Sequence, residues 1–125
     1  RLSVTINQLR RYKTIVQSIK NDLQLLDELI LKSKPFDMVG GNPYAVSDNV
    51  AKIVLEREKM RRNIESLINQ KNAVEDYIMR AEPYYRGFLW QHYIQGHTWA
   101  AIAIKSNTTE ESLKKSCHRY VRKNP

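Results

Sequence analysis

Hydrophobic residues at intervals of seven dominate the first quarter of the chain and constrain most strongly what it can fold into. The residues with this spacing are Leu2, Leu9, Val16, Leu23 and Ile30, and Tyr12, Ile19 and Leu26 fill positions between them. No Pro or Gly interrupts residues 2–32. The pattern predicts one long helix, about 45 Å at the helical rise, with an apolar seam facing a partner helix.

A second run of the same kind covers residues 50–81. Its seam keeps the spacing of three and four, with Arg57 and Lys71 at two of the positions and apolar residues at the others: Val50, Ile53, Met60, Ile64, Leu67, Val74 and Ile78. Between the two runs stand the helix-breaking residues Pro35, Gly40, Gly41 and Pro43. We therefore predict a loop over residues 33–49. A loop of that length reverses the chain, so residues 1–82 are predicted to form a long antiparallel helical hairpin, similar to a coiled coil.

Further apolar residues beside both seams make the hydrophobic stripes wider than the contact between two helices would cover. They are Ile6, Ile15 and Leu29 in the first run, and Val54 and Ile68 in the second. A third helix of the same chain could cover them, and so could a second copy of the chain. A homodimer formed through the hairpin is therefore one of two interpretations that the sequence leaves open.

Residues 83–125 form a second predicted domain. Pro83 suits the first turn of a helix. The aromatic stretch behind it offers a core face composed of Phe88, Leu89, Trp90, Tyr93 and Ile94. Gly96 and His97 are predicted to turn the chain into a further helix that starts near Thr98, and the polar residues 106–109 to end that helix. Thr108 and Glu111 have the spacing of a capping box for the last helix.

That last helix has two faces of opposite character. An apolar inner face is predicted from the spacing of Leu113, Cys117, Tyr120 and Val121. The basic residues Lys114, Lys115, His118, Arg119 and Arg122 fall largely on the other side. A helix of this kind, presented by another helix across a short turn, is what a DNA-reading helix-turn-helix requires. The sequence therefore predicts an all-α fold with a C-terminal helix-turn-helix.

Basic residues are concentrated in the second domain. The formal net charge of the whole chain is +8. Residues 83–125 contain seven Lys or Arg against two Glu, whereas residues 1–82 contain fourteen against eleven acidic residues. This excess fits a surface that faces phosphates, and a merely solvated basic face is the alternative interpretation.

The motif W-x-x-I-A-x-x-x-N-x-T-E-E-S-L-K resembles region four of bacterial sigma factors. The residues that occupy the places of that pattern are Gly96, Trp99, Ile102, Ala103, Asn107, Thr109, Ser112 and Leu113. Ala101 stands where Glu is usual, and Ser106 where an apolar residue is usual. We therefore expect the core of the helical pair to be filled from Ile104 or from elsewhere. The layout of the whole chain is similar to that of phage late-transcription regulators of the RinA/ArpU type.

The resemblance implies a sequence-specific DNA-binding regulator of transcription from a phage or prophage, an activator of late genes, with the last helix in the major groove. The residues that it assigns to base contacts are Glu111, Ser112, Lys114 and Lys115. Those that it assigns to phosphate contacts are Thr109, His118, Arg119 and Arg122. The implied partners are double-stranded DNA and RNA polymerase. The alternatives are an assembly protein similar to a phage small terminase subunit, which packages DNA, and a helical protein whose terminal helices only pack.

No pattern in the sequence indicates catalysis. His92, His97 and His118 have no Cys or acidic partner at metal-ligand spacing, and no nucleophile elbow is present. We therefore expect no enzyme activity, no cofactor and no metal. Cys117 is expected to be a buried small hydrophobic residue. No apolar run approaches the length of a membrane span and no signal peptide opens the chain, so we expect a cytoplasmic protein without a membrane partner.

Overall fold

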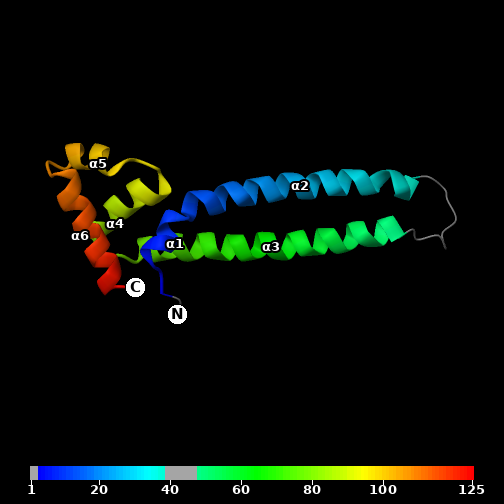
Figure 1. Ribbon diagram of the computed structural model, residues 1–125, viewed down its shortest axis with the longest axis horizontal. Helices are drawn as coiled ribbons and strands as arrows, with labels where there is room; N and C mark the ends of the chain where they lie inside the picture. Colours follow the sequence, from blue (N-terminus) through cyan, green and yellow to red (C-terminus); the bar gives the residue numbers. More distant parts are fainter. Residues whose placement is uncertain (1–2, 39–47) are drawn as a thin grey trace. The chain divides into compact units, whose positions relative to one another are not determined.

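The computed structural model describes residues 3–38 and 48–125, and within these ranges it contains helices and no strand. In chain order the elements are α1 (Ile6–Arg10), α2 (Tyr12–Met38), α3 (Asp48–Met79), α4 (Pro83–Leu89), η1 (Trp90–Ile94, one π-helical turn), α5 (Trp99–Lys105) and α6 (Glu110–Lys123). Figure 1 shows them along the chain. The predicted all-α fold is confirmed.

The contacts within the chain group it into two compact units. Unit 1 contains residues 1–15 and 70–125, and unit 2 contains residues 16–69. Helices α2 and α3 therefore each contribute to both units. The boundary predicted after residue 82 stays a prediction, because a grouping by contacts does not test which part folds alone.

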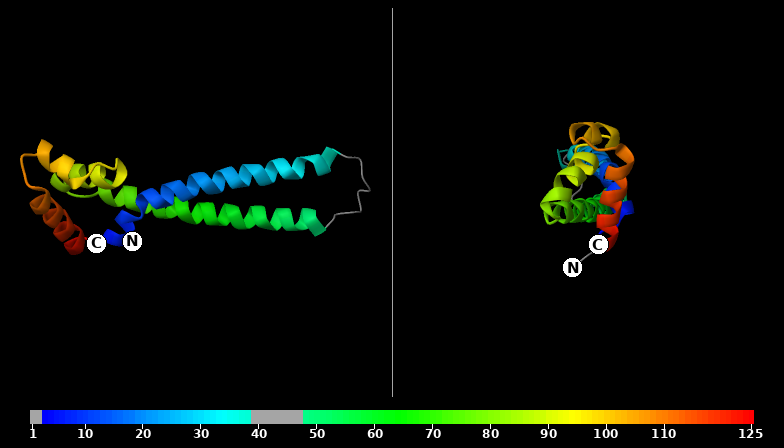
Figure 2. Two further views of the ribbon diagram at one scale, coloured as in Figure 1. Left: turned by 45° about the horizontal axis from the view of Figure 1, so that its top comes forward. Right: turned by 90° about the vertical axis from the view of Figure 1, so that its left-hand side faces the viewer.

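Unit 2 is an antiparallel pair of helices. Residues 16–38 of α2 and 48–69 of α3 run side by side in Figure 1 and in the left view of Figure 2. The Asn63 amide donates a hydrogen bond across the pair to Asp22 (2.9 Å). Among the side chains described in this unit, that of Ile64 is buried, whereas Leu23, expected in the apolar seam, is 46% exposed. A pair of helices has no third element to shield the outer side of its seam, which explains the difference.

The first helix of the structure starts later than the sequence predicted. It begins at Ile6 rather than at residue 2, because Thr5 forms a capping box. The Gln8 N–H donates to Thr5 Oγ1 (3.3 Å), and the Thr5 N–H donates to Gln8 Oε1 (2.8 Å). The helix is also interrupted once, at Arg11, where α1 ends and α2 begins.

The first predicted helix also extends further than expected. Helix α2 continues through Pro35 to Met38, so the prediction of a loop starting at residue 33 is wrong. A proline removes one backbone N–H and one helical hydrogen bond. Helix α2 nevertheless continues for three residues past Pro35 without that hydrogen bond. Helix α3 starts at Asp48, so residues 48–49 are helical as well. Residues 39–47 of the predicted loop lie outside the described residues.

The core of unit 1 joins the start of the chain to its end. Its buried apolar residues are Val4, Leu9, Tyr12, Ile15, Val74, Tyr77, Ile78, Ala81, Leu89, Tyr93, Trp99, Ile102, Ala103, Leu113, Cys117 and Val121. The end of α6 is held against this core by two hydrogen bonds. The Tyr77 hydroxyl donates to the Asn124 carbonyl (2.5 Å), and the Glu82 N–H donates to the Tyr120 hydroxyl (3.0 Å). Helix α6 is thereby held at its C-terminal end.

Candidate nucleic-acid interface

Helix α5 is a short helix with one buried side. Its N-cap is Thr98, whose hydroxyl accepts a hydrogen bond from the Ala101 N–H (3.1 Å), so the helix starts where the sequence predicted. Trp99, Ile102 and Ala103 are buried. Ile104 is 79% exposed, so of the two alternatives left open the core is filled from elsewhere. Trp99 and Ile102 fill the core in its place.

The turn between α5 and α6 is closed by a left-handed residue. Asn107 has φ +54°, and the Thr108 N–H donates back to the Ala103 carbonyl (3.1 Å). This is the hydrogen bond of a Schellman motif, in which the residue after the helix cap adopts the left-handed conformation. Asn is one of the few side chains that tolerate it. Asn107 is therefore the residue through which the sequence specifies this turn.

Helix α6 is capped by Thr109 and not by Thr108. The Thr109 hydroxyl accepts from the Ser112 N–H (3.2 Å), and Thr109 has the extended backbone of an N-cap (φ −89°, ψ 150°). The predicted capping box at Thr108 is wrong because that residue still belongs to the closure of α5. Glu110 and Glu111 lie in the first turn of α6, where carboxylates are favoured by the helix dipole.

The two faces of α6 are those that the sequence predicted. Leu113, Cys117 and Val121 are buried, at 4%, 0% and 2% exposed. Burial also raises the pKa of the Cys117 thiol to about 12, as fits a packed hydrophobic residue. The half-buried Tyr120 stacks on Tyr85, with ring centroids 4.3 Å apart. This inner face packs α6 into the core of unit 1.

The outer face of α6 carries the eight predicted site residues. Seven of them are exposed: Thr109, Glu111, Ser112, Lys114, Lys115, Arg119 and Arg122. The eighth, His118, is half-buried. A hollow is lined by Lys115, His118, Arg119 and Arg122. The Lys115 ammonium lies 3.2 Å from the Glu111 carboxylate, as the spacing of four predicted. All eight thus lie on one helix and at its cap, with four basic side chains around one hollow.

The segment before α5 supports this helical pair. Leu89 and Tyr93 of the predicted aromatic core are buried, and Phe88, Trp90 and Ile94 are half-buried. The π-helical turn η1 is closed by the Gln95 N–H, which donates to the Trp90 carbonyl (3.0 Å). Gly96 follows with φ +84°, so the predicted turn is present there. The His92 ring lies flat on Trp99, with centroids 4.0 Å apart, and its Nδ1 is 2.8 Å from the His97 carbonyl.

The two histidines beside Trp99 lie in a positive environment. Burial lowers the pKa of His118 below its ordinary value, and the positive charges of Arg10, Lys114 and Arg122 lower it further. Repulsion from His92 has the same effect on this pKa when that ring is protonated. Burial likewise lowers the pKa of His92. The His97 carbonyl opposes this effect, and the cations Lys13, Lys114 and Arg10 add to it. Both imidazoles are therefore kept neutral near pH 7 while fixed cations surround them.

Arg10 and Lys13 are surface cations of this region that the sequence-based interpretation missed. They belong to the first predicted helix, about a hundred residues before α6. No sequence pattern would have found them, because their position depends on the packing of α1 beside α6. Among the described residues, neither forms an ion pair with a carboxylate.

Other kinds of site find little support in the described ranges. Among residues 3–38 and 48–125, no group of three or more His, Cys, Asp or Glu side chains could hold a metal ion. No helix of the described chain is long and apolar enough to cross a membrane. Comparison of the chain with models of protein families, with curated proteins and with solved structures finds no match. Geometry and charge are therefore what a functional proposal rests on.

Proposed function

We propose that the protein is a sequence-specific DNA-binding regulator of transcription that inserts α6 into the major groove. The observation that carries the proposal is the division of α6 into a buried apolar face and an exposed basic face, behind the tight turn at Asn107. A helix of 14 residues is about 21 Å long. Its first turns suit the base edges, as in other helix-turn-helix proteins.

The exposed residues divide into two groups under this proposal. Base edges are contacted by residues of the first two turns: Glu111, Ser112, Lys114 and Lys115. The cap and the later turns, with Thr109, His118, Arg119 and Arg122, contact phosphates and set the register of the protein on the duplex. By resemblance to the RinA/ArpU type, the regulated genes are late genes of a phage or prophage, and RNA polymerase is a second partner.

The exposed apolar side chains of unit 2 support a homodimer. They include Leu23, Leu25, Leu31, Val54, Leu55 and Ile68. A second copy would shield them from water, and two copies of α6 would then read two half-sites. Sedimentation of the full chain tests this part: a dimer supports it. A ring of eight or more subunits would favour the packaging protein instead.

Selection of bound sequences from a random DNA library tests the function itself. We expect a clear consensus. The double variant Lys114→Ala/Arg119→Ala should bind that consensus at least tenfold more weakly and with a smaller salt dependence. The matched control is Lys20→Ala/Lys59→Ala, which removes the same charge from exposed positions of unit 2. No enrichment in the selection, or equal losses in variant and control, would contradict the proposal.

A further inference from the structure

A hollow lies where the start of the chain packs beside the turn that leads into α5. From the start of the chain it is lined by Leu9, Arg10 and Lys13, and from the segment after α4 by residues that include His92, Gly96 and Thr98. Its lining therefore includes two cations, the imidazoles of His92 and His97, and the hydroxyls of Tyr93 and Thr98. The side chains of Arg10 and Lys13 are exposed and accessible to a ligand.

Lys13 lies directly against the backbone at Gly96. A Cβ added to Gly96 would stand 2.1 Å from Lys13 Nζ and 2.7 Å from Lys13 Cε. The ammonium group can approach so closely only because residue 96 has no side chain. Gly96 adopts the left-handed turn (φ +84°), and a side chain at this position would displace the flexible end of Lys13.

The charges around the hollow have no counter-ion within the described chain. The ion pairs among the described residues join Arg61 to Glu58, Lys71 to Glu75, and Lys115 to Glu111. Arg10 and Lys114 each act on both His92 and His118, so the N-terminal cations and the basic face of α6 form one positive region. Gathering like charges without a carboxylate costs stability, and an anionic partner removes that cost.

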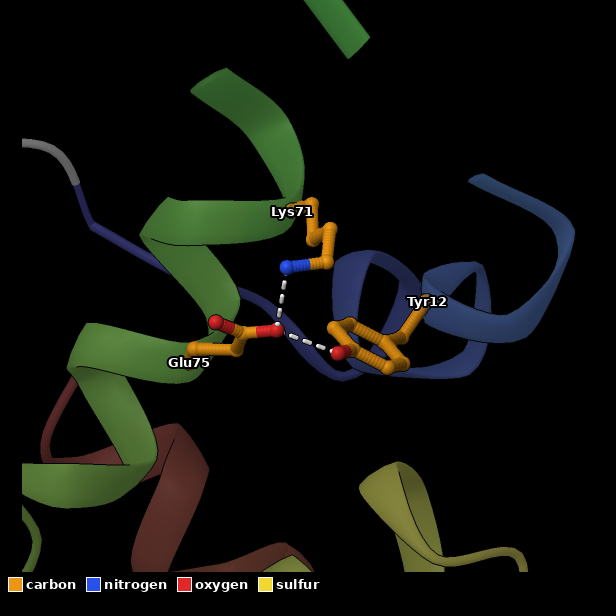
Figure 3. A network of polar contacts seen from close by, with 3 residues as sticks. All are labelled: Tyr12, Lys71 and Glu75. Atoms are coloured by element: carbon orange, nitrogen blue, oxygen red, sulfur yellow. Dashed lines mark hydrogen bonds and ion pairs between the residues drawn. The ribbon is translucent and has the colours of Figure 1, made fainter. Parts of the chain in front are cut away.

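The backbone that carries the two cations is anchored at Tyr12, which lies two residues after Arg10 and one before Lys13. Figure 3 shows the Tyr12 hydroxyl donating a hydrogen bond to the Glu75 carboxylate. The same carboxylate forms an ion pair with the Lys71 ammonium, at 2.8 Å. Burial tends to raise the pKa of Glu75, but the hydrogen bonds from Lys71 and Tyr12 and the charge of Lys71 outweigh it and lower this pKa. Leu9, Tyr12 and Ile15 are buried beside this network. Arg10 and Lys13 thus project from a segment tied to α3.

We propose that Arg10 and Lys13 form a second anchoring site for the DNA backbone, which binds a phosphate of the same duplex that α6 reads. This inference rests on the proposed function and adds a contact that lies outside the helix-turn-helix. A helix in the major groove has a sugar-phosphate strand on each side. The cations of α6 can neutralise phosphates near their own helix, and the N-terminal pair supplies charge beyond it.

Salt dependence of binding by the full chain tests this proposal. The test variant is Arg10→Ala/Lys13→Ala, and the matched control is Arg11→Ala/Lys20→Ala. The control removes the same charge from neighbouring exposed residues that do not line the hollow. The slope of log Kobs against log salt should fall by about two in the test variant, one for each cation, and stay unchanged in the control. The selected consensus should stay the same in both, because phosphate contacts carry no sequence information.

Three outcomes separate this proposal from the one on which it rests. A test variant that behaves like its control, while Lys114→Ala/Arg119→Ala loses binding, would overturn the anchoring site and leave the proposed function intact. If neither variant loses affinity, the proposed function fails as well. An amide shift of Gly96 on titration with inorganic phosphate, with no change in the DNA salt slope, would assign the hollow to free anions and overturn its role on DNA.

Discussion

The imidazole of His92 stacks on the indole of Trp99 with ring centroids 4.0 Å apart and planes inclined by 18°. His118 approaches the same indole edge-on, at 6.2 Å between centroids. Trp99 is buried and belongs to α5, so the helical pair is held partly through two titratable rings. Protonation of either ring would put a charge into a partly buried site already surrounded by cations.

This arrangement predicts that unit 1 loses stability in mild acid. The pKa values of His92 and His118 are lowered from 6.5 in the folded protein. The unfolded chain therefore binds more protons between the lowered values and 6.5, and stability rises with pH across that interval. The stabilisation is complete above about pH 6.5 and is lost as the pH falls through the folded-state values.

Urea unfolding at pH 7.5 and pH 5.5 measures this effect. Trp90 and Trp99 are the two tryptophans of the chain and both lie in unit 1, so their fluorescence reports on this unit. The difference between the two midpoints should shrink in His92→Gln/His118→Gln and persist in His97→Gln, the control. A wild-type midpoint that is the same at both pH values would contradict the prediction.

The left-handed turn residue predicts a second stability difference. Asn107 is exposed, so replacing its side chain removes no packing. Asn107→Gly should leave stability unchanged or raise it slightly, because Gly adopts positive φ without strain. Asn107→Ala should cost about 1 kcal/mol, since an alanine Cβ is disfavoured in the left-handed region. The same fluorescence measurement compares the three proteins, and an alanine variant as stable as the glycine variant would speak against a Schellman turn here.

The sequence periodicity predicted the positions of the helices more accurately than it predicted which of their side chains are buried. The heptad residues Leu9 and Leu23 are equivalent in the sequence, but Leu9 is 1% and Leu23 is 46% exposed. The reason is local: in unit 1, Leu9 has α6 and the segment 92–98 beside its own helix, whereas in unit 2 Leu23 has a single partner helix. A repeat of seven specifies a face of a helix and does not specify how many neighbours cover that face.

That contrast gives a third prediction. Leu9→Ala should destabilise unit 1 by about 2–5 kcal/mol, the usual range for truncating a fully buried leucine. Leu23→Ala should cost less than about 1 kcal/mol in the monomer, because much of the side chain is already in water. Urea unfolding followed by circular dichroism, at a concentration where the chain is monomeric, measures both. A large loss for Leu23→Ala under these conditions would mean that the side chain is covered.

The candidate site could be predicted from the sequence where it depends on one helix. The faces of α6 and the pair Glu111–Lys115 follow from spacing alone, and the structure has both. The N-cap of α6 is Thr109, one residue after the predicted Thr108. The Thr108 N–H is used instead to close the turn at the left-handed Asn107. The proximity of Arg10 to α6 could not be predicted, since it arises from packing between segments about a hundred residues apart.

The last prediction concerns how α6 reads DNA. Glu111 and Lys115 are 79% and 70% exposed and lie 3.2 Å apart, a surface ion pair that contributes little to stability. Breaking this ion pair therefore costs little free energy, so that each side chain is available to contact DNA. On DNA the same face would meet base edges, with Lys115 donating to a guanine and Glu111 accepting from a cytosine amino group. A correct base contact of this kind discriminates by about 1–3 kcal/mol.

Glu111→Ala should therefore relax the sequence preference at one base pair and leave non-specific affinity unchanged or slightly tighter, because a negative charge is lost. Glu110→Ala is the matched control: it removes the same charge from the neighbouring exposed residue of the first turn and should keep the preference. Lys115→Ala should weaken specific binding more than non-specific binding. Affinities for the selected sequence, its single-base variants and random DNA measure all three effects. Equal shifts for every sequence would mean that α6 contacts only the backbone, and the base-contact assignments would then be wrong.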